Sequence, residues 1–227
     1  MRAVLLHSPL VGPSTMSALA EAFDRFRWNT AVIDSTAELQ SPSSFLQRTI
    51  EQITWPQPLL IGHSGAGAFL PTLAARTHAV AAVFVDAVLP PANAPFRPTP
   101  AFVEFIDTLP TVDGHLPKWS EWWPAGTIEE LVSDGNARDA VLADMPTVKR
   151  SFYDHQLEVP ANWSNQPCCY LQLSPAYADE CDRAVQWDWP THRLDGRHLD
   201  IIERADVVAL QVVELVERLG QDVQPEP

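Results

Sequence analysis

Short apolar runs alternate with stretches of helical periodicity along the first part of the chain. Runs without polar alternation are typical of strands that are covered on both faces. They occupy residues 2–7, 30–34, 58–63 and 80–86. Between them the apolar positions recur at helical spacing, which predicts helices within residues 14–26, 43–54 and 65–76. Strands and helices that alternate in this way predict βαβ units and a mostly parallel sheet with helices on both faces.

This rhythm stops after the fourth strand and resumes near residue 166. Residues 91–165 hold many prolines and no strong strand pattern, so we interpret them as an inserted helical and irregular cap. Two further strands and two further helices are then expected, at 168–173 and 189–194 and at 178–187 and 204–219. The predicted organisation is an α/β core from residues 1–90 and 166–227, with a cap from 91–165.

Composition narrows the classes of function. Hydrophobic residues make up 46% of the 227 positions and charged residues 19%, as in globular proteins. The net charge of −14 disfavours nucleic acids and anionic membrane surfaces as partners, because both are bound chiefly through Lys and Arg. No apolar run approaches the roughly 20 residues of a membrane helix. The three cysteines form no metal-binding or disulfide pattern, and we expect a cytoplasmic protein with reduced thiols.

A candidate nucleophile lies where the third predicted strand meets a helix. The segment Gly-His-Ser-Gly-Ala-Gly, residues 62–67, differs from Gly-x-Ser-x-Gly only in its last position, where Ala66 is also small. Such a turn lifts the serine hydroxyl above the sheet edge and needs small neighbours, because strand and helix nearly touch. The helix amino terminus adds free N–H groups that suit a developing oxyanion. Ser64 is therefore the predicted nucleophile, and Gly65 supplies one oxyanion donor.

A candidate base follows the last predicted strand. His198 lies in the turn before the final helix, and it follows Ser64 in the chain order that a serine nucleophile on such a fold requires. His63 precedes the nucleophile, its side chain is expected to point elsewhere, and we interpret it as structural.

The sharp turn at residues 62–67 (the nucleophile elbow), the inserted cap and the loop histidine together resemble the α/β-hydrolase family over nearly the whole chain. It is most similar to the small esterase-like and hydroxynitrile-lyase-like members. The resemblance implies a Ser–His–acid triad, a cap above the active site and no cofactor, and it does not imply one substrate.

The resemblance leaves the triad acid open. Most members place it after the strand that follows the cap, which here offers Asp179, Glu180 or Asp182, although the usual Gly-x-x-Asp spacing is absent. A minority place it at the end of the preceding strand, where this sequence has Asp86. An aspartate at the end of an apolar strand needs a partner. Asp86 is the preferred acid, and Asp179 is the alternative.

The oxyanion loop departs from the family pattern. Where members usually have His-Gly and then a residue that donates its N–H, this sequence has His7-Ser8-Pro9. Proline has no N–H. The second donor must therefore shift to Leu10 or be missing.

Three tryptophans, Trp119, Trp122 and Trp123, lie close together in the expected cap. They pack within the cap or line an apolar pocket beneath it. The sequence thus predicts a serine hydrolase for a small apolar or aromatic ester, lactone or thioester. The alternatives are lyase, cyclisation or acyl-transfer chemistry on the same fold, or a catalytically silent ligand-binding protein.

Overall fold

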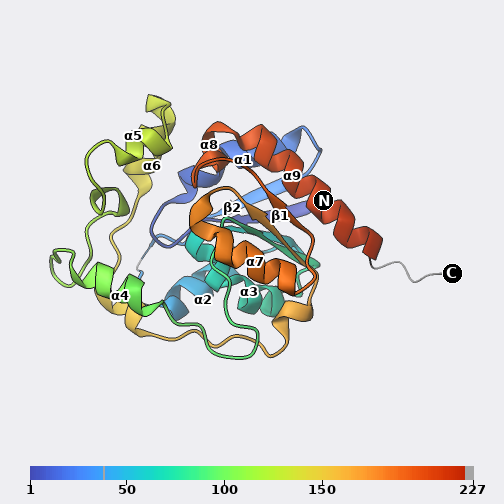
Figure 1. Cartoon of the computed structure of the whole chain (residues 1–227), viewed down its shortest axis with the longest axis horizontal. Coiled ribbons are helices and arrows are strands. Elements are labelled where there is room, and N and C mark those ends of the chain that lie inside the picture. Colours follow the sequence, from blue (N-terminus) through green and yellow to red (C-terminus); the bar gives the residue numbers. More distant parts are fainter. Residues whose placement is uncertain (38, 223–227) are drawn as a thin grey trace.

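The structure, a computed structural model, describes residues 1–37 and 39–222, with the side chains of 221 and 222 excepted. Its centre is one sheet of six parallel strands in the order β2-β1-β3-β4-β5-β6 (Figure 1). The strands are β1 (Arg2–Leu6), β2 (Asn29–Ile33), β3 (Leu59–His63), β4 (Ala81–Val85), β5 (Cys168–Gln172) and β6 (Thr191–Arg193). The predicted parallel sheet and all six predicted strands are confirmed.

The helices cover both faces of this sheet. One face packs against α1 (Ser17–Asp24), α8 (Asp200–Glu203) and α9 (Ala205–Asp222), and the other against α2 (Pro42–Gln52), α3 (Leu70–Thr77) and α7 (Ala178–Gln186) (Figure 1). Successive strand residues point to opposite faces, as in any strand. In β3, for example, Leu59 and Ile61 pack in the apolar core on the face covered by α1, α8 and α9, and Leu60 packs in the core on the opposite face. The continuous apolar runs of the sequence have this double burial as their cause.

Two of the predicted helices begin as 3₁₀ turns. Residues Pro13–Met16 precede α1, and residues Ser64–Ala68 precede α3. Pro71 lies in the first turn of α3, where the missing proline N–H costs nothing.

The segment between β4 and β5 forms no strand within the described chain, only isolated bridges such as Phe96 with Leu157. It carries α4 (Pro100–Asp107), α5 (Thr127–Leu131) and α6 (Gly135–Asp144). These helices lie to one side of the sheet and its covering helices (Figure 1). Ile106, Leu116 and Trp122 form a small apolar cluster of their own in this segment.

Because all six strands are parallel, the loops that follow them meet at one edge of the sheet. Ligands of open α/β sheets bind at this edge, beside the point where the strand order reverses. Here β1 lies between β2 and β3, so the reversal brings the loop after β1 beside the loop after β3. Among the described residues, no helix is both long and apolar enough to cross a membrane.

Candidate active site

Ser64 occupies a tight turn between β3 and the helix that follows. Its φ of 58° lies in the left-handed region, which a residue with a side chain adopts only when its surroundings enforce it. The neighbouring glycines explain how this turn packs so closely against α3 and the loop after β4. A Cβ on Gly67 would lie 2.1 Å from the carbonyl oxygen of Val88, and one on Gly62 would lie 2.9 Å from Leu70. The local sequence therefore folds into a strained elbow that presents the serine hydroxyl.

Asp86 and His198 form a hydrogen-bonded pair beside this elbow. Asp86 directly follows β4 and has a φ of 43°. The Nδ1–H of His198 donates to Asp86 Oδ2 at 2.7 Å. This bond orients the imidazole and leaves Nε2 as the acceptor, which is the tautomer that a general base requires.

Asp86 is completely buried, and both of its carboxylate oxygens accept hydrogen bonds. Its Oδ1 accepts the backbone N–H groups of Leu173 and Ser174, at 2.8 and 2.9 Å, and its Oδ2 also accepts the Ser174 hydroxyl at 2.6 Å. Burial acts to raise the pKa of this carboxyl, but the hydrogen bonds and charge of His198 and the bonds from Ser174 leave the pKa below its usual value. Asp86 is thus held as a carboxylate.

The alternative acids lie elsewhere. Asp179 is exposed in the first turn of α7. Glu180 pairs with Arg183 at 3.3 Å, and Asp182 pairs with Arg193. Within the described chain, none of the three acidic side chains is hydrogen-bonded to His198, whose bonded carboxylate is Asp86.

The hydroxyl of Ser64 contacts Tyr177, from the loop after β5. A hydrogen bond of 3.2 Å joins Ser64 Oγ and Tyr177 Oη. The Tyr177 ring also stacks on the His198 ring, with centroids 5.1 Å apart and planes 12° apart. Within the described part of the chain no hydrogen bond joins Ser64 to His198, although both border one small cavity of about 20 Å³. Catalytic hydrogen bonds are often loose before substrate binds.

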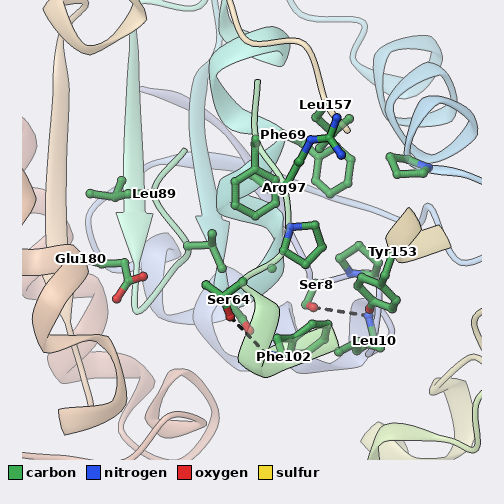
Figure 2. Close-up of a pocket in the computed structure, with 18 of the residues that line it drawn as sticks. Ser8, Leu10, Ser64, Phe69, Leu89, Arg97, Phe102, Tyr153, Leu157 and Glu180 are labelled. Atoms are coloured by element: carbon green, nitrogen blue, oxygen red, sulfur yellow. Dashed lines mark hydrogen bonds between the residues drawn. The ribbon is translucent and has the colours of Figure 1, made fainter. Parts of the chain in front are cut away.

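A larger cavity of about 450 Å³ also borders Ser64 (Figure 2). Its walls are mainly apolar and come chiefly from the loop after β1, the elbow, the segment between β4 and β5, and the start of α7. They include Leu10, Ala68, Phe69, Leu89, Phe102 and Phe152. Arg97, His155 and Arg183 also line it, together with Glu180. An apolar cavity that holds few polar groups suits a small organic ligand.

The three tryptophans do not share one location. Trp119 borders the small cavity with Ser64 and His198. Trp122 is buried against Phe102 and Phe105, and Trp123 stacks on Phe105 with centroids 5.6 Å apart. The structure does not place Trp122 or Trp123 on either cavity wall, because their rings pack within the segment between β4 and β5.

The loop after β1 is a tight turn with Pro9 in its second position. The Val11 N–H donates to the Ser8 carbonyl at 3.1 Å, and the Leu10 N–H donates to Ser8 Oγ at 3.3 Å. The Leu10 N–H, which the sequence suggested as an oxyanion donor, is therefore already engaged. Gly65 lies against this loop, since a Cβ on it would be 2.8 Å from Ser8 Oγ.

Sequence reasoning missed three neighbours of the site. Ser174 and Tyr177 follow β5, and their place at the carboxyl edge of the sheet is the one signal that pointed to them. His63 contacts His198 directly, which its position beside the nucleophile did not indicate. Within the described chain, no group of His, Cys, Asp and Glu side chains is arranged to hold a metal ion.

Comparisons with known proteins agree with this fold. Residues 8–218 match the alpha/beta hydrolase family. No curated protein matches the sequence significantly. An extracellular α/β-hydrolase from a Paenibacillus species superposes with a TM-score of 0.73 at 13% identity, over 95% of this chain and 98% of the other.

Two further solved structures show the same fold. A pyrethroid hydrolase from Sphingobium faniae JZ-2 has a TM-score of 0.69 at 15% identity, over 96% of this chain and 97% of its own. Tomato methylketone synthase I has a TM-score of 0.73 at 10% identity, over 96% and 97%. At such identities the superpositions show the fold alone, whereas the family match spans most of the sequence. The chain belongs to the α/β-hydrolase family.

Proposed function

We propose that this protein is a serine hydrolase that acts on a small apolar carboxylic ester, lactone or thioester. Ser64 is the nucleophile, His198 the general base and Asp86 the triad acid. The observation that carries the proposal is the 2.7 Å bond between Asp86 and His198, formed beside a serine on a strained elbow. The same three roles recur on many hydrolytic folds and are recognised by their geometry.

The first half of the reaction forms an acyl-enzyme. His198 Nε2 takes the proton of Ser64 Oγ as this oxygen attacks the substrate carbonyl carbon. Ser64 first exchanges its contact with Tyr177 for one with His198 Nε2. The carbonyl π electrons move to oxygen, and as the tetrahedral intermediate collapses the bond to the alcohol or thiol breaks. The imidazolium returns its proton to this leaving group. Asp86 stabilises the imidazolium throughout without taking the proton.

The second half restores the enzyme. A water molecule attacks the acyl carbon while His198 Nε2 accepts its proton. The bond to Ser64 Oγ breaks, the serine oxygen regains that proton from His198, and a carboxylic acid leaves. The cavity beside Ser64 supports an apolar acyl or alcohol group, because its walls are largely aliphatic and aromatic.

The experiment that tests this function is covalent labelling with a fluorophosphonate, read by intact mass. Wild type is expected to gain one adduct, and Ser64→Ala and His198→Ala none. His192→Ala, a half-buried histidine on β6, is the matched control and should label like wild type. No adduct on a well-folded wild type, in a cavity shown to admit the probe, would sink the proposal.

One observation favours a second candidate, a non-hydrolytic reaction in the same cavity. Pro9 has no N–H and the Leu10 N–H is engaged, so the loop offers no free backbone donor at these positions. A lyase, cyclisation or acyl-transfer reaction would consume substrate without net addition of water. Running turnover in H₂¹⁸O separates the two, because hydrolysis alone places ¹⁸O in the carboxylic acid product.

A further inference from the structure

The loop after β1 leaves the proposed hydrolase short of one oxyanion donor. Acyl transfer needs hydrogen-bond donors aimed at the carbonyl oxygen as it gains charge. The N–H of Gly65, the residue after the nucleophile, supplies one. Pro9 has no N–H to supply the other, and the Leu10 N–H points instead to Ser8 Oγ at 3.3 Å.

The hydroxyl of Ser8 has a proton to give. Among the described residues, the one hydrogen bond of Ser8 Oγ is the bond it accepts from the Leu10 N–H. A serine hydroxyl both donates and accepts, so its proton is still available. Ser8 is buried, with 3% of its surface exposed, yet it borders both cavities that Ser64 borders. Buried polar groups are almost always hydrogen-bonded, so a hydroxyl proton with no acceptor in the protein is expected to point into the cavity, where a ligand can accept it.

The position of this hydroxyl matches the missing donor. A Cβ built on Gly65 would lie 2.8 Å from Ser8 Oγ, so the hydroxyl lies against the backbone of the residue that supplies the first donor. Figure 2 shows Ser8 and Ser64 at the same end of the cavity, with the Leu10 N–H bonded to Ser8 Oγ. We propose that the Ser8 hydroxyl is the second oxyanion donor, and that it acts together with the Gly65 N–H.

The surrounding loop holds the hydroxyl in place. The Ser8 carbonyl accepts the Val11 N–H at 3.1 Å and the His7 Nδ1–H at 2.8 Å. His7 Nε2 in turn accepts the Ser35 N–H at 3.3 Å. With one ring nitrogen donating and the other accepting, His7 is neutral and its ring is fixed. The Leu10 N–H both anchors Ser8 Oγ and polarises its O–H bond, so the donor is preorganised before substrate arrives.

This inference rests on the proposed function and deepens it, because it assigns a catalytic residue to that same site. Removing one oxyanion donor lowers kcat by about 10²–10³-fold in other hydrolases. The donor acts on charge that develops in the transition state, so its loss should change KM far less than kcat.

The experiment compares Ser8→Thr with Ser8→Val, two β-branched side chains of similar volume that differ by the hydroxyl. Ser8→Ala completes the series. Hydrolysis of p-nitrophenyl esters is measured for each, together with inhibition by a trifluoromethyl ketone, which becomes an oxyanion when Ser64 adds to it. Ser8→Val and Ser8→Ala should lose about 10²–10³-fold in kcat and in ketone affinity, whereas Ser8→Thr should keep most of both.

A fold control accompanies the series. Thr77→Val removes a half-buried hydroxyl that donates to the Leu73 carbonyl at 2.8 Å in α3, and Thr77 lines neither of the cavities that Ser64 borders. It should lose stability without losing kcat per folded molecule. Because the Thr and Val variants are equally bulky, a difference between them reports the hydroxyl even where both unfold at lower temperature than wild type.

The outcomes separate the role of Ser8 as an oxyanion donor from the proposed hydrolase function. Ser8→Val with the kcat and ketone affinity of Ser8→Thr, on a wild type that is active and labelled at Ser64, overturns the role of Ser8 and leaves the proposed function standing. A wild type that neither hydrolyses esters nor reacts with the phosphonate overturns both.

Discussion

The ring of His63 lies against the ring of His198, with centroids 4.5 Å apart. His63 Nε2 also donates to the His198 backbone carbonyl at 2.9 Å. The residue just before the proposed nucleophile therefore contacts both the side chain and the backbone of the proposed base. This contact ties the loop that carries His198 to the end of β3, and so fixes the distance between the two reacting groups.

His63 makes stability depend on pH. Burial, followed by the nearby His198, lowers its pKa from 6.5 to about 3. The unfolded chain therefore binds a proton at this position between those pH values that the folded chain does not bind. The free energy of unfolding should thus be unaffected by His63 above about pH 6.5 and should decrease as the pH falls toward 3.

Urea unfolding of His63→Asn between pH 7 and pH 4 measures this. In the variant, the free energy of unfolding should decline less steeply with falling pH, by up to about 1.4 kcal/mol per pH unit. This is the slope that a difference of one bound proton between the unfolded and folded states produces. Thr77→Val, which alters no titratable group, is the control for a change of stability alone and should keep the wild-type slope. Equal slopes for wild type and His63→Asn would contradict the account.

Asp86→Asn tests the triad acid against its alternative. The amide cannot hold His198 in the productive tautomer, so kcat for ester hydrolysis should fall by roughly 10³–10⁴-fold, as in other triads. Asp179→Asn removes the same charge from an exposed helix start and should stay within about twofold of wild type. A larger loss in Asp179→Asn than in Asp86→Asn would reverse the assignment.

The Tyr177 hydroxyl is hydrogen-bonded to the Ser64 hydroxyl at 3.2 Å, a contact that competes with one to the proposed base His198. Burial raises the pKa of Tyr177 to about 12, so the phenol stays protonated at neutral pH. Tyr177→Phe removes the hydroxyl but keeps the ring that stacks on His198. Its phosphonate labelling rate should match or exceed that of wild type, while Tyr177→Ala should label more slowly because His198 loses its stacking partner. Abolished labelling in Tyr177→Phe would instead make the hydroxyl part of the machinery.

The elbow should tolerate no side chain at Gly67. An alanine there would place its Cβ 2.1 Å from the Val88 carbonyl oxygen, and backbone atoms cannot move aside cheaply. Gly67→Ala should lose about 1–3 kcal/mol of stability and most of its activity. Gly220→Ala is the matched control in α9, where nothing lies within 4 Å, and should gain about 0.5–1 kcal/mol. Equal thermal stability of Gly67→Ala and wild type would argue against the close approach.

The sheet could be predicted from the sequence because its four central strands, β1, β3, β4 and β5, are buried on both faces. β3 and β4 are continuous apolar runs, and such runs have few other interpretations when helices separate them. The segment between β4 and β5 gave no such signal. Its residues pack by local aromatic contacts, such as Phe105 on Trp123, which leave no periodic pattern.

The sequence predicted a site residue where a single local motif specifies its role. The elbow motif identifies Ser64 because the turn from strand to helix requires small residues on either side of the serine. The acid stayed open because its identity depends on which loop reaches His198 in space, and Ser174, which bonds Asp86, is 88 residues away in the sequence. The sequence pointed to Tyr177 and Ser8 only through their loops, which follow β5 and β1 at the carboxyl edge of the sheet, and it assigned neither side chain a role.

Trapping the acyl-enzyme shows whether Ser64 attacks an ester carbonyl. Wild type is mixed with p-nitrophenyl butyrate, quenched in acid within milliseconds to seconds, and read by intact mass and peptide mapping. We predict a butyryl adduct on Ser64 that forms with a burst of one nitrophenol per protein and decays at the rate of steady-state turnover. Turnover with no adduct, or an adduct on another residue that persists in Ser64→Ala, would contradict it.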